Sequence, residues 1–150
     1  MLRNFLNLAK TFLVIIHRLY GKFLTYFSND FSSILLRLGL SLVFLWFGFS
    51  QLFNPDNFIG YVPQFAYALP MSSLTIVFLN GLYEVVFGTL LLLGFFTRVS
   101  ALLLALKLFV IILSNGYNDI SVRDFGLALA TLSVYFHGHD SLSLDNKTKK

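Results

Sequence analysis

Four long apolar runs, separated by short polar turns, dominate the sequence from Ile34 to Phe136. A helix needs about 20 apolar residues to cross a bilayer core of about 30 Å, and the first two runs reach that length. The last run is short for a span, so we expect it to tilt, to thin the bilayer or to shelter against its neighbours. The predicted fold class is all-α, a bundle of four transmembrane helices. The expected spans cover residues 34–53, 74–96, 99–113 and 122–136.

The composition agrees with a membrane location. Of the 150 residues, 57% are hydrophobic and only 12% are charged, whereas soluble proteins carry roughly a quarter charged residues. The net charge of +4 comes from basic residues beside apolar segments, which suits anionic lipid headgroups better than nucleic acid. The chain has no cysteine, so a disulfide, a thiolate metal site and a dithiol redox relay within it are excluded.

The N-terminal region shows a different pattern. In residues 2–27, polar residues recur at three- and four-residue steps while Leu, Phe, Ile and Tyr fill the opposite side, which predicts an amphipathic helix. A spanning helix would bury Lys10, Arg18 and Lys22 together, so a helix lying in the membrane interface fits better. A partner-binding helix is the alternative. The polar residues 28–30 then predict a break before the first span.

The expected organisation has three parts: a helix and linker over residues 1–32, a four-helix membrane domain over 33–137 and a polar cytoplasmic tail over 138–150. Basic residues concentrate on the cytoplasmic side of membrane proteins. With four spans, Arg123 alone falls on one side. We therefore expect a protein of the cytoplasmic membrane with both termini in the cytoplasm. The basic residues on the other side are Arg3, Lys10, Arg18, Lys22, Arg37, Arg98, Lys147, Lys149 and Lys150.

Glu84 and Lys107 lie deep inside apolar runs. A charge in hydrocarbon costs about 2.5 to 3.5 kcal/mol on insertion scales, so such residues usually pair and often mark function. Counted from the turn at Thr97 at about 1.5 Å per residue, they lie roughly 20 and 15 Å from the same membrane face. Adjacent antiparallel helices can therefore bring them together. The pair either fixes helix register or forms a polar site, to which Asn80 and Gln51 would contribute.

Other positions have two interpretations each. Gly81 and Gly88 permit close helix approach, which packing alone explains. The uncharged, aromatic stretch 58–71 either anchors a loop in the interface or forms a lid over a ligand cleft. The aromatic residues Trp46, Phe47 and Phe49 either contact lipid or the protein core, or stack on the flat ring of a ligand. The run His137 to Asp140 matches no familiar metal pattern, so we expect a solvated helix end and no metal site.

Several short motifs recur in an order that is similar to a known family. They are Leu36-Arg37-Leu38-Gly39, Gly48, Glu84, Gly88, Leu91-Leu92-Leu93-Gly94, Thr97-Arg98, Gly138 and Ser143-Leu144-Asp145. On these residues the chain resembles the DoxX family of small four-helix bacterial and archaeal membrane proteins, which includes DoxD-like subunits. The similarity extends from about Leu36 to Asp145. The chain departs from the family pattern at three positions. Gln51 lies where many relatives look to have a basic residue, Asp140 replaces a second glycine of the tail motif, and Lys107 is not part of the pattern.

The resemblance implies a membrane component of redox systems. Some members are thiosulfate:quinone oxidoreductase subunits, and others are partners of soluble antioxidant enzymes. We therefore predict an accessory subunit, rather than a self-sufficient enzyme, that binds a quinone-like or lipid headgroup and anchors a redox partner. The predicted intramembrane polar site consists of Arg37, Gln51, Asn80, Glu84 and Lys107.

In that prediction, Arg37 or Lys107 donates a hydrogen bond to a carbonyl oxygen, and Glu84 balances their charge or accepts a proton. Arg37 lies one turn inside its span and is also expected to snorkel toward the headgroups. No covalently bound cofactor is expected, and electrons would come from another subunit. A noncatalytic scaffold or assembly factor and a small transporter are the alternatives, and homo-oligomer formation is left open.

Overall fold

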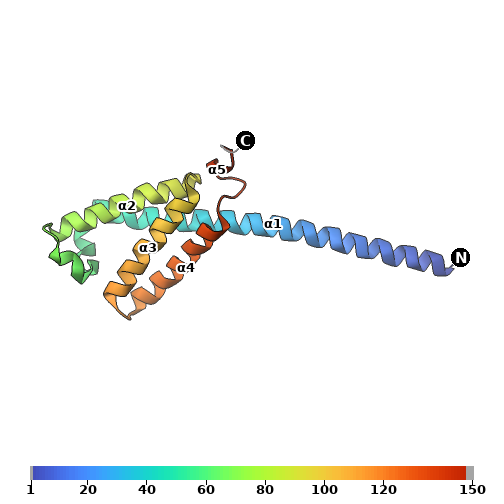
Figure 1. Ribbon diagram of the computed structural model, residues 1–150, viewed down its shortest axis with the longest axis horizontal. Coiled ribbons are helices and arrows are strands. Elements are labelled where there is room, and N and C mark those ends of the chain that lie inside the picture. The colour runs from blue at the N-terminus through green and yellow to red at the C-terminus, as the bar shows by residue number, and fades with distance from the viewer. Residues whose placement is uncertain (1, 148–150) are drawn as a thin grey trace. The chain divides into compact units, whose positions relative to one another are not determined.

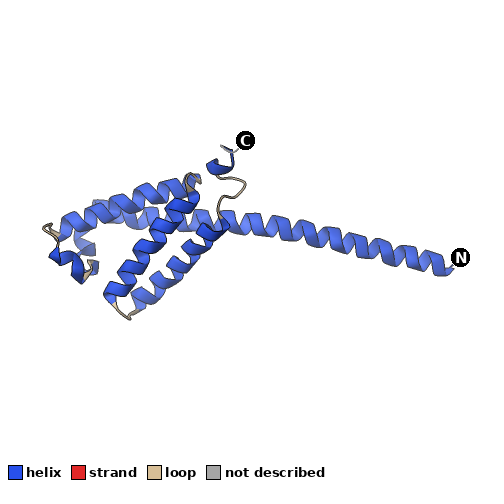
Figure 2. Cartoon of the chain, in the orientation of Figure 1, coloured by secondary structure: helices blue, strands red, loops and turns tan. Residues whose placement is uncertain are grey.

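The computed structural model describes the backbone of residues 2–147 and the side chains of Ile16, Gly21 and residues 30–147. This described part is helical and contains no strand (Figure 2), so the predicted all-α class is confirmed. The elements in chain order are α1 (Leu2–Phe53), η1 (Pro55–Tyr61), η2 (Gln64–Ala68), α2 (Ser73–Leu93), α3 (Thr97–Asn115), α4 (Asp119–His137) and α5 (Leu144–Lys147) (Figure 1).

The chain divides into two compact units, Met1–Ser32 and Ser33–Lys150. The predicted break at residues 28–30 is wrong, because the helical assignment of α1 continues through it. Ser, Asn and Asp favour caps and turns only moderately, and a long run of helix-forming neighbours outweighs that preference. The charged side chains on the predicted amphipathic face of residues 2–27 lie outside the described residues. The interfacial position of this helix therefore stays a prediction.

Three helical segments in the described part are long and apolar enough to cross a membrane: Asp30–Phe53, Ser73–Leu93 and Thr97–Asn115. The protein is thus a multi-pass membrane protein. Helix α4 differs because its first turns carry Asp119, Arg123 and Asp124. It packs along α3 (Figure 1), which gives its less apolar surface a protein neighbour.

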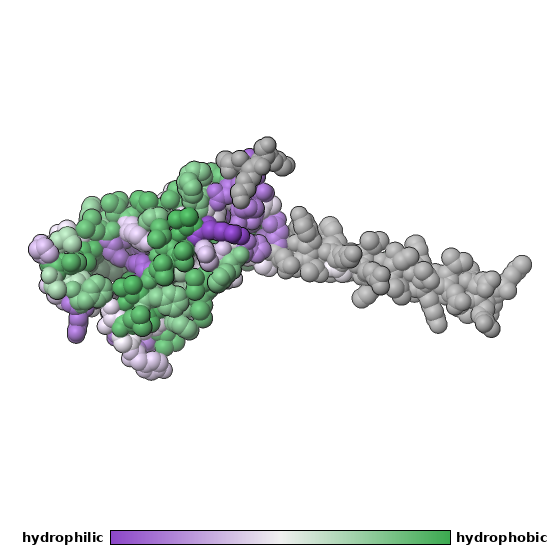
Figure 3. All heavy atoms as spheres, in the orientation of Figure 1, coloured by the Kyte–Doolittle hydropathy of each residue, from purple (hydrophilic) through white to green (hydrophobic). Residues whose placement is uncertain are grey.

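The apolar core of the second unit draws on all four long helices. Leu40 and Phe44 of α1 meet Leu91 of α2, Leu104 of α3 and Ala128 of α4. Large apolar side chains also point outward from these helices. Figure 3 shows them covering much of the visible face of this unit, whereas hydrophilic residues gather near the C-terminal tail. An apolar exterior of this kind is what a lipid environment requires.

Local chemistry sets the helix ends. The Ser72 hydroxyl accepts a hydrogen bond from the Thr75 backbone and caps α2, which ends at Gly94 in the left-handed conformation with φ +66°. Such a glycine commonly terminates a helix because it has no Cβ to clash. Helix α4 begins at Asp119, and the side chain of Asn118 caps it by accepting a hydrogen bond from the Ser121 backbone.

Candidate functional site

A cavity of about 610 Å³ lies within the second unit. Its wall takes residues from α1, α2, α3, α4 and the two short 3₁₀ helices, and most of these residues are apolar. Ligand pockets in proteins span about 300 to 1,000 Å³ and combine apolar walls with a few placed polar groups. The cavity has both properties, because Gln51, Asn80, Glu84 and Lys107 line it together.

These four residues form a hydrogen-bonded chain across three helices. Asn80 donates from Nδ2 to Oε1 of Gln51. Gln51 donates from Nε2 to Oε2 of Glu84 over 2.7 Å. Lys107 of α3 donates from Nζ to the other carboxylate oxygen, Oε1. The structure thus places Glu84 and Lys107 in direct contact and brings four of the five predicted site residues together.

Close packing of α1 on α2 positions this chain. A Cβ on Gly81 would lie 2.9 Å from the carbonyl oxygen of Gly48 and 2.9 Å from Cβ of Gln51. A Cβ on Gly48 would likewise lie 3.0 Å from Cβ of Glu84. Glycine at both positions therefore lets the helix backbones approach closely enough for Gln51 to reach Glu84. Gly88 continues this contact, packing against Phe44.

A second pair of charges lines the same cavity from α4. Arg123 and Asp124 form an ion pair of 2.9 Å. The Asp124 side chain is buried, whereas that of Arg123 is 54% exposed. The guanidinium also lies over the ring of Phe47, 5.4 Å from its centroid. The cavity therefore contacts two carboxylates and two cations, of which Arg123 reaches the surface of the unit.

The segment after α1 covers part of the cavity. Phe58, Tyr61, Phe65 and Leu69 line the cavity, and Val62 and Ala66 pack against Val77 of α2. Tyr61 and Phe65 also expose about half of their surface, so the same segment faces both the cavity and the outside. Both predicted roles, an interfacial anchor and a lid, agree with this position.

The aromatic residues of the first span differ from one another. Phe47 lines the cavity. Trp46 is 73% exposed, and Phe49 is partly exposed and stacks on Phe53. Of Trp46, Phe47 and Phe49, it is therefore Phe47 that is placed to contact a ring inside the cavity.

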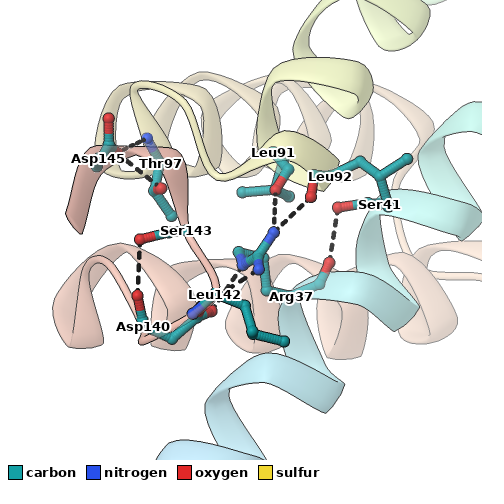
Figure 4. A network of polar contacts seen from close by, with 9 residues as sticks. All are labelled: Arg37, Ser41, Leu91, Leu92, Thr97, Asp140, Leu142, Ser143 and Asp145. Carbon is teal, nitrogen blue, oxygen red and sulfur yellow. Dashed lines mark hydrogen bonds and ion pairs between the residues drawn. The ribbon is translucent and has the colours of Figure 1, made fainter. Parts of the chain in front are cut away.

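Arg37, the fifth predicted site residue, belongs to a separate group (Figure 4). Its guanidinium bonds both carboxylate oxygens of Asp140, at 2.6 and 3.2 Å. It also donates to the carbonyl oxygens of Leu91 and Leu92 at the end of α2. The expectation that Arg37 snorkels to the headgroups is wrong, because the residue is 2% exposed and has protein acceptors for its donors.

The C-terminal tail carries the partners that sequence reasoning missed. Asp140 was expected at a solvated helix end, but it is 3% exposed. A signal for this pairing existed, since an arginine inside an apolar span needs an acid partner. Ser143 is also fully buried and donates to the Asp140 carbonyl oxygen.

Asp145 holds the turn between α2 and α3. Its carboxylate accepts from the backbones of Phe96 and Thr97 and from the Thr97 hydroxyl, at 2.8 to 2.9 Å. Its backbone N–H donates to Gly94. Burial raises the pKa of the Asp145 carboxyl, but the hydrogen bonds from Thr97 and Phe96 outweigh burial, so the pKa lies below the ordinary value of 3.8.

The remaining motif positions lie near this tail. A Cβ on Gly138 would lie 2.8 Å from Nε of Arg98, so the arginine packs over the glycine. His137 and His139 are exposed. Among the described side chains, no group of three or more His, Cys, Asp or Glu residues could hold a metal ion.

Comparison with known proteins gives one match. The DoxX family model matches residues 32–115, more than half of the chain. The matched part contains Arg37 and the cavity residues Gln51, Asn80, Glu84 and Lys107, whereas α4 and the C-terminal tail lie outside it. No curated protein and no solved structure matches the chain.

Proposed function

The chain belongs to the DoxX family of membrane proteins, and we propose that it binds a quinone-like headgroup in the cavity beside Glu84. The observation that carries this proposal is the coincidence of an apolar cavity of about 610 Å³ with a polar chain on its wall. The ligand class is amphipathic, with an apolar ring or tail and a few oxygen atoms.

The donors on the wall suit such a ligand. Lys107 carries three N–H donors and uses one of them in its hydrogen bond to Glu84. A remaining donor can bond a ligand oxygen, while Glu84 keeps the ammonium neutralised. The ring would lie against apolar and aromatic side chains such as Phe44, Phe47 and Leu108. A lipid headgroup with the same oxygen chemistry is the competing occupant.

In this proposal the protein acts as an accessory subunit of a membrane redox system. It holds the headgroup and anchors a redox partner that supplies electrons, and Glu84 balances charge or accepts a proton. The partner would dock through the N-terminal helix or the C-terminal tail.

Ligand binding tests the proposal directly. Purified protein in nanodiscs should bind a decyl-substituted quinone in a saturable way. Glu84→Gln should weaken binding by roughly tenfold or more, because it removes the carboxylate that holds Lys107 in place, and the charge-assisted hydrogen bond from Lys107 to the ligand contributes about 1.5 to 3 kcal/mol. Asp119→Asn is the matched control, since Asp119 is exposed and does not line the cavity. Displacement of the quinone by phospholipid but not by a second quinone would favour the lipid headgroup instead.

A noncatalytic scaffold is the second candidate, favoured by the contact between Glu84 and Lys107 because such a pair can serve helix register alone. A scaffold predicts that the paired change Glu84→Leu with Lys107→Leu preserves function in cells, whereas deletion of residues 1–28 abolishes it. The quinone proposal predicts the loss of function in the paired variant.

A small transporter would need a water path to Glu84. The exposed Arg123 beside the cavity offers the nearest polar route. Glu84→Cys should then react with a membrane-impermeant thiol reagent, whereas a closed site leaves the thiol unlabelled.

A further inference from the structure

The polar chain on the cavity wall has a fixed direction. Lys107 donates to one oxygen of Glu84 and Gln51 donates to the other, so both carboxylate oxygens act as acceptors. An ionised carboxylate can only accept hydrogen bonds. Gln51 must therefore turn its NH₂ group toward Glu84, which leaves its Oε1 facing Asn80.

The orientation of the Gln51 amide also determines the orientation of the Asn80 amide. Because Oε1 of Gln51 can only accept, Asn80 must present its own NH₂ group to it. The amide orientation at Asn80 is thus set by a carboxylate two side chains away. Its carbonyl oxygen, Oδ1, turns to the other side, and no donor among the described residues bonds it. Asn80 is half-buried and lines the cavity.

The cavity wall therefore presents two different hydrogen-bonding groups to a ligand, the donor Lys107 and the acceptor Asn80 Oδ1. Lys107 can donate to a carbonyl, a hydroxyl or an ether oxygen, because each of them has a lone pair, so its hydrogen bond does not require a hydroxyl. Asn80 Oδ1 is an acceptor and needs a donor. A ligand that brings only acceptors leaves this oxygen without a partner, and a partly desolvated group without its hydrogen bond costs free energy.

From this asymmetry we infer that the cavity selects hydroxyl-bearing headgroups, such as a hydroquinone, over headgroups that carry only carbonyl or ether acceptors. The inference rests on the proposed function and adds to it a preference between the two redox forms of the same ring. Asn80 is the residue that sets the preference, and Gln51 positions it.

A set of ligands with the same decyl tail tests the preference: a hydroquinone, its dimethyl ether and the corresponding quinone. Isothermal titration calorimetry on the full chain in nanodiscs should give roughly tenfold tighter binding for the hydroquinone, the effect of one hydrogen bond. Asn80→Leu should abolish the preference, because the hydroquinone loses its hydrogen bond and the ether and the quinone no longer leave an oxygen of Asn80 without a partner. Asn57→Leu is the matched control, since Asn57 is exposed and does not line the cavity.

Gln51→Leu gives an independent readout. It frees the Asn80 amide to rotate, so the three ligands should approach equal affinity while Asn80 remains in place. Circular dichroism and thermal unfolding confirm that each variant is folded. Equal affinity of the three ligands for the wild-type chain, or a preference that survives Asn80→Leu, overturns the inference and leaves the proposed function standing. Absence of binding by all three overturns both.

Discussion

Two ion pairs are buried in the same helical unit, and their surroundings differ. Arg37 and Asp140 expose 2% and 0% of their side chains, and the arginine also bonds two backbone carbonyl oxygens. Lys107 and Glu84 expose 13% and 6% and line a cavity of about 610 Å³. The first pair has few donors to spare. The second retains unused donors beside an open volume.

The contrast teaches that burial of a charge does not by itself mark a functional site. Both pairs satisfy the requirement that an intramembrane ion finds a partner. What separates them is the hydrogen-bonding capacity that remains after pairing. We therefore interpret the Arg37 pair as structural and propose the Glu84 pair as part of a binding site, and the following variants test that difference.

The largest effect is expected at Arg37. Arg37→Leu should lower the free energy of unfolding by about 3 to 5 kcal/mol, because it leaves the carboxylate of Asp140 buried without its counter-ion. Thermal or SDS-induced unfolding in detergent measures the change. The double variant with Asp140→Leu should recover only part of the loss, since the carbonyl oxygens of Leu91 and Leu92 also lose their donor. Full recovery would show that the backbone contacts contribute little.

A smaller loss is expected at the helix contact that positions the second pair. Gly81→Ala places a methyl group 2.9 Å from the Gly48 carbonyl oxygen, and such overpacking costs about 1 to 3 kcal/mol. It should also weaken quinone binding, because α1 and α2 move apart and Gln51 loses Glu84. Gly39→Ala is the matched control, since nothing lies within 4 Å of its added Cβ. A stable Gly81→Ala variant that still binds ligand would contradict the proposed role of the contact.

A pH dependence is expected from Asp145. Its folded-state pKa lies below the ordinary 3.8, so its stabilising contribution is present above about pH 4 and is lost as the pH falls through the folded pKa. Asp145→Asn removes one of the two acceptor oxygens and the charge behind the hydrogen bonds from Phe96 and Thr97, and should cost about 1 to 2 kcal/mol at pH 7. Unfolding curves of both chains between pH 7 and 3 should converge in acid. A constant difference would show that the carboxylate charge is unimportant.

The smallest effect on stability is expected for Glu84→Leu combined with Lys107→Leu. Replacing a whole buried ion pair with apolar residues is often neutral or stabilising, so we expect a change within about 1 kcal/mol. Ligand binding should nevertheless be lost. A large loss of stability in this variant would remove the distinction between the two pairs and favour a register role for Glu84.

Much of the architecture could be predicted from the sequence. The apolar runs locate the helices, and counting depth from the turn at Thr97 places Glu84 and Lys107 side by side. The position of Arg37 could not be predicted in the same way, because its partner Asp140 is 103 residues away in a polar segment without periodicity. The break expected at residues 28–30 is absent for a related reason, since weak local preferences yield to the surrounding helix.

The pairing of Arg37 with Asp140 also bears on how the protein is made. Arg37 lies in α1, whereas Asp140 follows α4 and is translated after every long helix of this unit. The guanidinium therefore has no counter-ion until the segment after α4 has been made. A nascent chain that stops between α4 and Asp140 contains all four long helices and still keeps an unmatched cation, which is a feature that membrane quality control recognises.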